Sequence, residues 1–458
     1  MRTRFTWILG AAVLISVAML AACNAKYTPS NNGLVVVSTQ YSAVMDTFSL
    51  DLENGRIAQI YNDNGPATNG VPTTVVLDPG GANAYVLVTQ SVDVNGSATG
   101  IEIFPVASDG KLGSGSTQSL NQTNPMTVFV PCTSQTNPPV TTQIPVPVPA
   151  VPVVPATMVM DSAGKYLFVA DAATSGPGTW TCNGQTFTSV PLPGAVSVLA
   201  VNNGSLSEVS GSPFLLPAEP GGTSPSASAL AVSPTIYPPA YAACSGHVPP
   251  TTENLYVTDS VNYVVLNYSV SSTGALALVP TSPSTPGIPT GNIPAGVTVD
   301  PCDRFVYVSN SGPGVDGNSV SAYTICNAVS LPTCTQADFS LRAVPGPTGS
   351  PTFAAGNTPG PLLEDGFANY LYVLDQGQNA ISGYKINPNT GSLQPFAATI
   401  ATNSVPMSMA IRSDNTWMFV TNLQQGNVSQ YAITPSSGFL TPQSPFQTDN
   451  TPWGVAVH

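Results

Sequence analysis

The sequence predicts an all-β protein, a seven-bladed β-propeller whose blades are four-stranded antiparallel sheets. A short apolar strand ends on a similar polar signature seven times, as LVVVST, AYVLVT, YLFVAD, NLYVTD, FVYVSN, YLYVLD and WMFVTN. Apolar residues alternate with a period of two and are rich in Val, Tyr, Phe and Thr, which is typical of strands. The 46 Pro and 40 Gly interrupt any longer element, so a helical fold is excluded.

The chain begins with a segment that we expect to be removed. Arg2 and Arg4 precede an apolar run over residues 7–22, and Cys23 follows it. The run is shorter than the roughly 20 residues that span a bilayer, and small residues precede the cysteine, as in a processed export signal. The sequence Leu-Ala-Ala-Cys resembles a bacterial lipobox, which implies acyl chains on Cys23. An ordinary cleaved signal on an unanchored protein is the alternative.

We therefore expect a lipoprotein signal peptide (1–22), a lipidated tether (23–32) and the propeller with long loop insertions (33–458). Several acyl chains give stable anchoring, so the predicted location is extracytoplasmic, with the protein lipid-anchored to the bacterial cell envelope. Asn24 stands where a signal for retention in the inner membrane more often has Asp. The outer membrane is therefore favoured in a cell with two membranes.

Each signature strand follows another apolar strand after a turn that contains Pro, Asp or Gly. Examples are PTTVVLDPGGANAYVLV and PAGVTVDPCDRFVYVSN. A third strand often follows, as at Ser319–Ile325, Ala380–Ile386 and Asn427–Ile433, and then a turn such as Asn-Thr-Gly. Four short antiparallel strands per unit are the pattern of a propeller blade.

The two ends of the propeller complete one blade. The first signature strand, residues 34–39, has no inner strand before it, and residues 452–458 have no signature strand after them. The C-terminal strand is therefore predicted to be the innermost strand of the blade whose outer three strands begin near residue 34. This pairing closes the ring and leaves no open edge there.

Seven blades leave surplus residues for insertions, because compact blades need only roughly 40 to 50 residues each. In the largest insertion, at 121–155, the segment PPVTTQIPVPVPAVPVVP is expected to be polyproline II and to be excluded from central strands. The other insertions are expected at 176–193, 234–253 and 328–351.

Composition excludes one class of partner. Only 7% of residues are charged, and 23 acidic residues outnumber 10 basic ones. Binding to a phosphate backbone depends on clustered Lys and Arg. No nucleic-acid partner is therefore expected.

The strands LYVTD, VYVSN and MFVTN, with VDP before them and NTG afterwards, resemble those of the YVTN-repeat propellers. These belong to a wider group whose enzymatic members resemble bacterial 6-phosphogluconolactonase, a seven-bladed propeller. The resemblance covers nearly all of the mature chain, and it implies the fold more specifically than the activity, since the repeated residues build blades. The chain departs from the pattern in the inner strand around 361–367 and in its long insertions.

Six cysteines remain besides Cys23, and an even number in an exported protein suggests disulfides. In a propeller, the turns from first to second and from third to fourth strand lie on one face, the bottom, and the other connections lie on the top. Cys244 and Cys302 fall in the same bottom turn of adjacent blades and are predicted to pair. Cys326 and Cys334 flank one third-to-fourth connection, and Cys132 and Cys182 lie in two top-face insertions, so these are the other two predicted pairs. Six free buried thiols are the alternative.

The polar residues that end the signature strands all fall at the top face. They are Asp171, Asp259, Asn310, Asp375 and Asn422. Such a ring could ligate a cation or hydrogen-bond a sugar. The favoured interpretation is structural, because Asp and Asn bond nearby backbone amides in turns. Asp78, Asp161, Asp300 and Asp414 occupy the bottom turns and are interpreted as structural as well.

No cofactor or metal is predicted. The chain has only two histidines, His247 in a loop and His458 at the end of the closing strand, and its cysteines lack the close spacing of zinc ligands. No Gly-x-Ser-x-Gly elbow or phosphate-cradling loop is present either. No catalytic residue is therefore assigned.

A phosphorylated lactone would need converging Lys or Arg side chains. The basic residues map to bottom-face turns, to the tether or to scattered outer strands, and they are Lys26, Arg56, Lys111, Lys165, Arg304, Arg342, Lys385 and Arg412. Phosphosugar lactones are also cytoplasmic, whereas this chain is expected to be exported. Hydrolysis of an uncharged lactone by an Asp or Glu that activates water stays open.

The preferred hypothesis is a non-catalytic envelope lipoprotein, a scaffold that binds a protein or a glycan. The binding face is expected on the loops near 121–155, 176–193 and 212–225, since rigidly supported loops suit recognition. The alternative is an extracytoplasmic lactonase, which the resemblance implies. It predicts that alanine at Asp171, Asp259 or Asp375 abolishes turnover without unfolding the ring.

Overall fold

The computed structural model describes residues 32–61, 65–89, 99–120, 126–136, 139–148, 153–218, 223–234, 252–279, 285–314, 316–327, 334 and 338–458. These residues form a ring of antiparallel β-sheets, with one short 3₁₀ helix, η2 (Pro347–Gly349), in the later half. Within these ranges no helix has the length and apolar character to cross a membrane.

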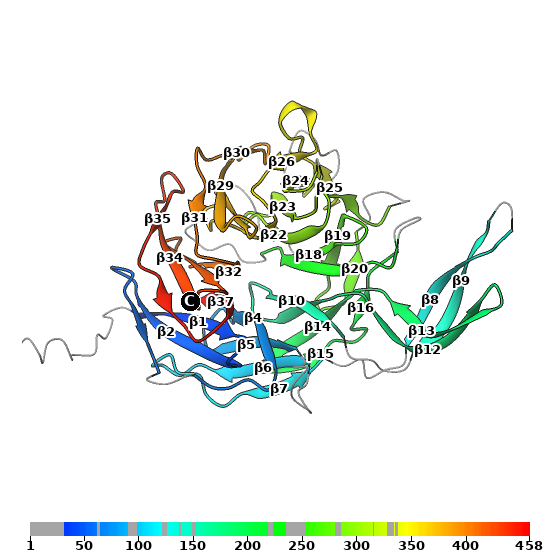
Figure 1. The fold of residues 1–458 in the computed structure, drawn as a ribbon, viewed down its shortest axis with the longest axis horizontal. Helices are drawn as coiled ribbons and strands as arrows, with labels where there is room; N and C mark the ends of the chain where they lie inside the picture. Colours follow the sequence, from blue (N-terminus) through cyan, green and yellow to red (C-terminus); the bar gives the residue numbers. More distant parts are fainter. Residues whose placement is uncertain are drawn as a thin grey trace, which may run out of the picture.

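Seven sheets of four strands in the same order make the blades (Figure 1), as the alternating pattern predicted. From blade 1 to blade 7, the innermost strands are β37 (Pro452–Val457), β4 (Val71–Leu77), β10 (Pro155–Met160), β17 (Ala227–Val232), β22 (Pro294–Val299), β27 (Pro359–Glu364) and β32 (Pro406–Ile411). The second strands, which carry the signatures, are β1 (Asn32–Thr39), β5 (Asn83–Thr89), β11 (Tyr166–Asp171), β18 (Glu253–Asp259), β23 (Phe305–Asn310), β28 (Tyr370–Asp375) and β33 (Trp417–Asn422).

The outer strands complete each blade. The third strands are β2 (Val44–Asp51), β6 (Gly100–Pro105), β14 (Ala195–Asn202), β19 (Val264–Val270), β24 (Ser319–Ile325), β29 (Ala380–Ile386) and β34 (Asn427–Ile433). The fourth are β3 (Ile57–Gln59), β7 (Ser116–Ser119), β15 (Ser205–Glu208), β20 (Leu276–Leu278), β25 (Leu341–Ala343), β30 (Leu393–Pro395) and β35 (Leu440–Pro442). In blades 3 to 7 a short fifth strand also pairs with the third: β16 (Phe214–Leu215), β21 (Ile288–Pro289), β26 (Thr352–Ala354), β31 (Ile400–Ala401) and β36 (Phe446–Gln447).

The ring closes as predicted, by pairing of β37 with β1 in an antiparallel ladder. Val35 lies opposite Val457 and Val37 opposite Val455 in this ladder. Each innermost strand also contacts the innermost strands of both neighbouring blades, and these contacts form a complete cycle through all seven. We call the edge where the second strands end the top face, and the edge where they begin the bottom face.

The innermost strand of blade 6 is more regular than its sequence suggested. The segment around 361–367 departs from the repeat pattern, yet β27 (Pro359–Glu364) pairs with β28 like its counterparts. The departure reflects the acidic pair Glu364 and Asp365 at its end, where other blades have an apolar residue before the turn.

The Ser or Thr before the last signature residue links neighbouring blades. In every blade the pairing between first and second strand shifts register near the top face, a bulge that leaves carbonyl groups of the innermost strand outside the ladder. A hydroxyl from the preceding blade donates to such a carbonyl. This bond recurs as Ser38 to Thr73 (2.5 Å), Ser309 to Gly360 (2.6 Å) and Thr421 to Trp453 (2.7 Å).

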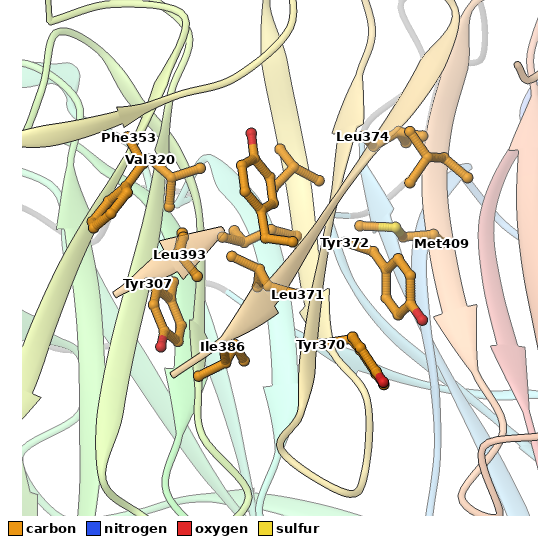
Figure 2. Packing of buried hydrophobic residues seen from close by; sticks show 14 of the residues in the cluster. Tyr307, Val320, Phe353, Tyr370, Leu371, Tyr372, Leu374, Ile386, Leu393 and Met409 are labelled. Carbon is orange, nitrogen blue, oxygen red and sulfur yellow. The ribbon is translucent and has the colours of Figure 1, made fainter. Parts of the chain in front are cut away.

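The core lies between blades, because side chains of each second strand pack against the next sheet. In the largest cluster, Tyr307 of blade 5 lies near Ile386 and Leu393 of blade 6, and Tyr372 of blade 6 lies near Met409 of blade 7 (Figure 2). Burying a large apolar side chain contributes about 1.5–3 kcal/mol, so each interface is stabilised by several such terms.

Tyrosine hydroxyls fasten the same interfaces at the bottom face. Tyr307 donates to the carbonyl of Gly391 (2.9 Å), and Tyr372 donates to that of Gly438 (2.7 Å). Both glycines have positive φ, 73° and 69°, and a Cβ on either would lie within 2.6 Å of Phe305 or Tyr370. Glycine is therefore required in these turns by conformation and by close approach.

Two insertions, one between blades 2 and 3 and one within blade 3, build a structure that the sequence did not predict. Strands β8 (Met126–Thr133) and β9 (Thr141–Val148) form one hairpin, and β12 (Thr174–Cys182) and β13 (Gln185–Leu192) form another. The two hairpins contact each other and project outward from the ring (Figure 1). We call β8, β9, β12 and β13 the hairpin arm.

The expectation of polyproline II is wrong for residues 141–148, which form strand β9. Ile144, Val146 and Val148 alternate with prolines, so every second residue packs into a small core with Val128 and Val190. Pro145 and Pro147 face outward, and β9 is an edge strand of a two-stranded sheet. Proline is tolerated on edge strands, so only the exclusion from central strands holds.

Candidate functional site

A five-residue motif opens several blades at the top face. It reads TNGVP at 68–72, TGNIP at 290–294, AGNTP at 355–359, TNSVP at 402–406 and TDNTP at 448–452. The sequence interpretation missed this motif, although its repetition before five of the seven innermost strands was a signal that could have found it. The threonine hydroxyls close the motif locally, as when Thr290 donates to Gly291 (2.8 Å) and Thr402 to Asn403 (3.0 Å).

In four of the five copies the residue before proline has positive φ although it is β-branched. The angles are 54° at Ile293, 51° at Thr358, 56° at Val405 and 59° at Thr451. Side chains of this shape rarely adopt such angles, so the surrounding structure must hold them there. Asn318 of the preceding blade accepts the Thr358 amide (2.9 Å), and Asn379 of the preceding blade accepts the Val405 amide (2.9 Å).

Most of the exposed large apolar side chains lie on this face and on the arm. Nine large apolar residues are exposed in the described part of the chain, and eight of these belong to top-face loops or to the hairpin arm. We call the six in the loops the rim: Tyr41, Val154, Val261, Tyr263, Ile293 and Val405. Val140 and Phe187 belong to the arm, and Phe439 is the exception on the bottom face. Only one such side chain lies on the described bottom face, so apolar exposure distinguishes the top face and the arm.

The five polar residues that end second strands are buried below this rim, each at most 2% exposed. Four of them bond a serine of the third strand in their own blade. Asp171 accepts from Ser197 (2.6 Å), Asp375 accepts from Ser382 (2.5 Å), Asn310 donates to Ser321 (3.0 Å) and Asn422 donates to Ser429 (3.0 Å). These bonds account for the recurrence of Asp and Asn within the blades.

The fifth residue, Asp259, binds its own turns instead. Its carboxylate accepts backbone amides from Ser226 (2.9 Å) and Val261 (3.0 Å) and the side-chain amide of Asn262 (2.7 Å). One side-chain oxygen on each of Asp171, Asn310 and Asn422 has no hydrogen-bond partner among the described residues. Those oxygens are the atoms that a ligand of the ring would have to reach.

Burial changes the protonation of the top-face carboxyls. It raises the pKa of Asp171 to about 7 and that of Asp375 to about 6, against the opposing bonds from their serines. Burial also raises the pKa of Asp46 to about 6, and the neighbouring carboxyl of Asp449 adds to that effect. These groups are therefore partly protonated near neutral pH, which suits proton transfer if water reaches them.

The cations among the described residues lie in the bottom half of the ring. The seven described cations lie in bottom-face turns or in the bottom ends of outer strands: Arg56, Lys111, Lys165, Arg304, Arg342, Lys385 and Arg412. Arg304 bonds Asp300 of its own turn and donates to the carbonyl of Ala368 in the next blade (3.3 Å). The top face therefore offers no described cation to a phosphate group.

The bottom-face aspartates are bonded within their turns, as the structural interpretation predicts. Asp161 accepts the amides of Lys165 (2.6 Å) and Tyr166 (2.9 Å), and Asp78 accepts that of Ala82 (2.7 Å). Glu364 is different, since its carboxyl is buried without a hydrogen-bond partner among the described residues. Burial raises its pKa well above the ordinary value, and the nearby carboxyl of Asp300 adds to that effect.

Two of the three predicted disulfides are confirmed. Cys132 is bonded to Cys182, which joins the two hairpins of the arm, and Cys326 is bonded to Cys334. Cys302 is also in a disulfide, and its predicted partner Cys244 lies outside the described residues. Cys23 and His247 lie outside them as well. His458 directly follows β37, with its imidazole 3.4 Å from the carbonyl of Pro79.

The family model described as a seven-bladed β-propeller lactonase matches residues 344–456, which include blades 6 and 7. No curated protein matches the sequence. Several solved structures share the fold over nearly the whole chain. A Bacteroides fragilis protein described as a candidate 6-phosphogluconolactonase has 14% identity and a TM-score of 0.61, with 94% of this chain and 99% of that chain covered.

Two further structures are similar to the same degree. A periplasmic gluconolactonase of Pseudomonas aeruginosa has 15% identity and a TM-score of 0.59, with 93% of this chain and 99% of that one covered. A protein from Lactobacillus plantarum has 14% identity and a TM-score of 0.60, with 93% and 100% covered. At such identities the similarity concerns the fold.

Proposed function

We propose that this protein is a cell-envelope lipoprotein whose propeller presents its top face as a binding surface for a protein or a glycan. The observation that supports the proposal is the rim of exposed apolar side chains, with the hairpin arm beside it. Two disulfides among the described residues suit an oxidising compartment outside the cytoplasm.

The position of the N-terminal strand indicates how the propeller would be oriented relative to the membrane. β1 begins at the bottom face, where the amide of Leu34 donates to the carbonyl of His458 (3.1 Å). If Cys23 carries the acyl chains, residues 24–32 span at most about 3.5 Å each, or roughly 30 Å in all. The bottom face would then be held near the membrane, and the top face would point away from it.

Photocrosslinking in cells tests this proposal. A photoreactive amino acid replaces Tyr41 or Val405 on the rim, or Phe439 on the bottom face as a matched exposed control, in the full-length protein. We expect adducts of higher mass from the two rim positions and fewer from Phe439. Equal labelling of all three positions, or no adduct from the rim, would contradict a binding role for the top face.

A second candidate is a lactonase that acts on uncharged lactones, supported by the family-model match that includes blade 6. Asp375 would take a proton from a water that attacks the lactone carbonyl, because its pKa of about 6 suits a general base. Proton release at constant pH from a panel of lactones tests it. Turnover that Asp375→Asn abolishes would establish it, and a flat trace would exclude it.

A further inference from the structure

We propose that the ligand of the rim and the hairpin arm is an uncharged polysaccharide. The inference rests on the proposed function and specifies the chemistry of the partner. Three features of the described surface carry it: the lack of charge, a stacked aromatic pair, and neutral hydrogen-bonding groups between the exposed apolar side chains.

The arm and the segments that flank it in the sequence contain no charged residue. Residues 112–160 and 172–207 include the whole arm and have no Asp, Glu, Lys or Arg. On the described top-face loops, Asp316 and Asp449 are the charged side chains that are not buried. The surface therefore offers no cation to an anionic polymer and almost no anion to a basic one.

The arm carries a flat aromatic pair. Trp180 of β12 and Phe187 of β13 stack with ring centroids 4.5 Å apart and planes inclined by 18°. The Trp180 indole nitrogen donates to the carbonyl of Ser189 (2.9 Å), which fixes the ring, and Phe187 is 38% exposed. The apolar C–H face of a sugar ring packs on aromatic surfaces of this kind, because it meets a large flat area with little loss of side-chain entropy.

Hydroxyl and amide groups stand between the apolar residues of the rim. Asn262 lies between Val261 and Tyr263, Asn292 precedes Ile293, and Ser404 precedes Val405. Both asparagines are held in place by bonds within the protein, Asn262 to Asp259 and Asn292 to the carbonyl of Pro313, which leaves their oxygens able to accept further bonds. Neutral amides and hydroxyls can each donate and accept, which matches the hydroxyl groups of a sugar. The alternation of apolar and neutral polar groups therefore fits a ligand with both characters.

A protein partner fits the same surface less well. Typical soluble domains contain about 25% charged residues, most of them on the surface. Covering such residues with an uncharged face would bury charges without partners, which is costly. An uncharged polysaccharide brings no charge into the contact.

Affinity electrophoresis of the mature full-length protein in detergent tests the proposal. The gels contain dextran, a β-linked glucan, or the anionic polymer alginate. We expect retardation in at least one neutral gel and none in alginate. Phe187→Ser should weaken the retardation about tenfold in apparent affinity. Phe439→Ser, which removes an exposed aromatic from the bottom face, should leave it unchanged.

Each other result has a definite meaning. Stronger retardation in alginate, or equal loss in both variants, overturns the assignment of an uncharged ligand to the arm. If no neutral polymer retards the protein while rim positions crosslink to an envelope protein, the polysaccharide proposal fails and the binding scaffold stands. If neither experiment gives a signal, both proposals fail.

Discussion

Asp171 shows how a repeated position can hold a carboxyl in one blade and an amide in another. Its partner Ser197 has counterparts in Ser321 and Ser429, which bond Asn310 and Asn422 at the same site. The fold therefore accepts either side chain there. The two side chains differ in their ionisation: a carboxyl here loses its proton above neutral pH, which is unfavourable in a buried position, whereas an amide stays uncharged.

We expect Asp171→Asn to stabilise the protein at pH 8 by on the order of 2 kcal/mol, because one pKa unit corresponds to about 1.4 kcal/mol. The folded-state pKa of about 7 lies above the unfolded value of 3.8, so the folded state binds more protons between them. Wild-type stability should thus fall as pH rises from 4 to 8, and the variant should lose part of that slope. Urea unfolding at pH 5 and pH 8 measures it. A destabilised variant at pH 8 would show that Asp171 is needed as a charge.

Tyrosine hydroxyls at the blade interfaces provide a second comparison of matched residues. Removing the Tyr372 hydroxyl strands the buried carbonyl of Gly438, so Tyr372→Phe should cost about 1–2 kcal/mol. The buried Tyr85 hydroxyl has no partner among the described residues, so Tyr85→Phe should be neutral or slightly stabilising. Thermal unfolding of both variants checks the contrast, and equal effects would contradict it.

Residue patterns predicted the signature strands, but only some of the contacts at the top face and in the arm. The alternation of Val, Tyr and Thr identifies a strand wherever it occurs, because one face must be buried. The role of the penultimate hydroxyl at Ser309 depends on a bulge in the neighbouring blade, which leaves no local mark in the sequence. The stacking of Trp180 on Phe187 likewise depends on a hairpin register that composition does not specify.

At the scale of elements, the hairpin arm is a separate small structure held by its own core and a disulfide. Cys132 and Cys182 are 50 positions apart in the sequence, and their bond connects β8 to β12. The connectivity could be predicted because both cysteines fell in top-face insertions. The hairpins could not, since alternating proline suggests an extended chain until a partner strand is known.

We expect the double substitution Cys132→Ser and Cys182→Ser to open the arm without unfolding the ring. A disulfide that closes a loop of this length typically contributes 2–4 kcal/mol, and here the contribution is local. Limited proteolysis should cut residues 126–192 at least tenfold faster, while the unfolding temperature of the ring stays the same. The pair Cys326→Ser and Cys334→Ser serves as the control. Loss of the ring transition in the first variant would show that the arm supports the propeller.

For the whole molecule, stability depends on the closed cycle of innermost strands. The number of blades and the closing strand could be predicted by counting two strand types, because each blade needs one of each. The same repetition prevents a prediction of the ligand from the sequence, since it places similar residues in every blade whether or not they contact a ligand.

Deleting residues 452–458 should abolish the compact monomer. The deletion removes the ladder between β1 and β37 and the contacts of β37 with β4 and β32. It also exposes the edge of β1 to other chains. Size-exclusion chromatography should show aggregated or expanded protein, whereas removal of His458 alone should be tolerated. A truncated chain that elutes and unfolds like the full one would contradict the importance of closure.

The closing ladder joins the first strand of the propeller to be synthesised to the last one. Gly454 donates to Ser38 across 416 positions, and ribosomes add roughly 5–20 residues per second, so the two are made on the order of 20 to 80 seconds apart. Throughout that interval β1 has an empty edge in its first blade. The first blade is therefore completed only after the last strand of the chain has been made.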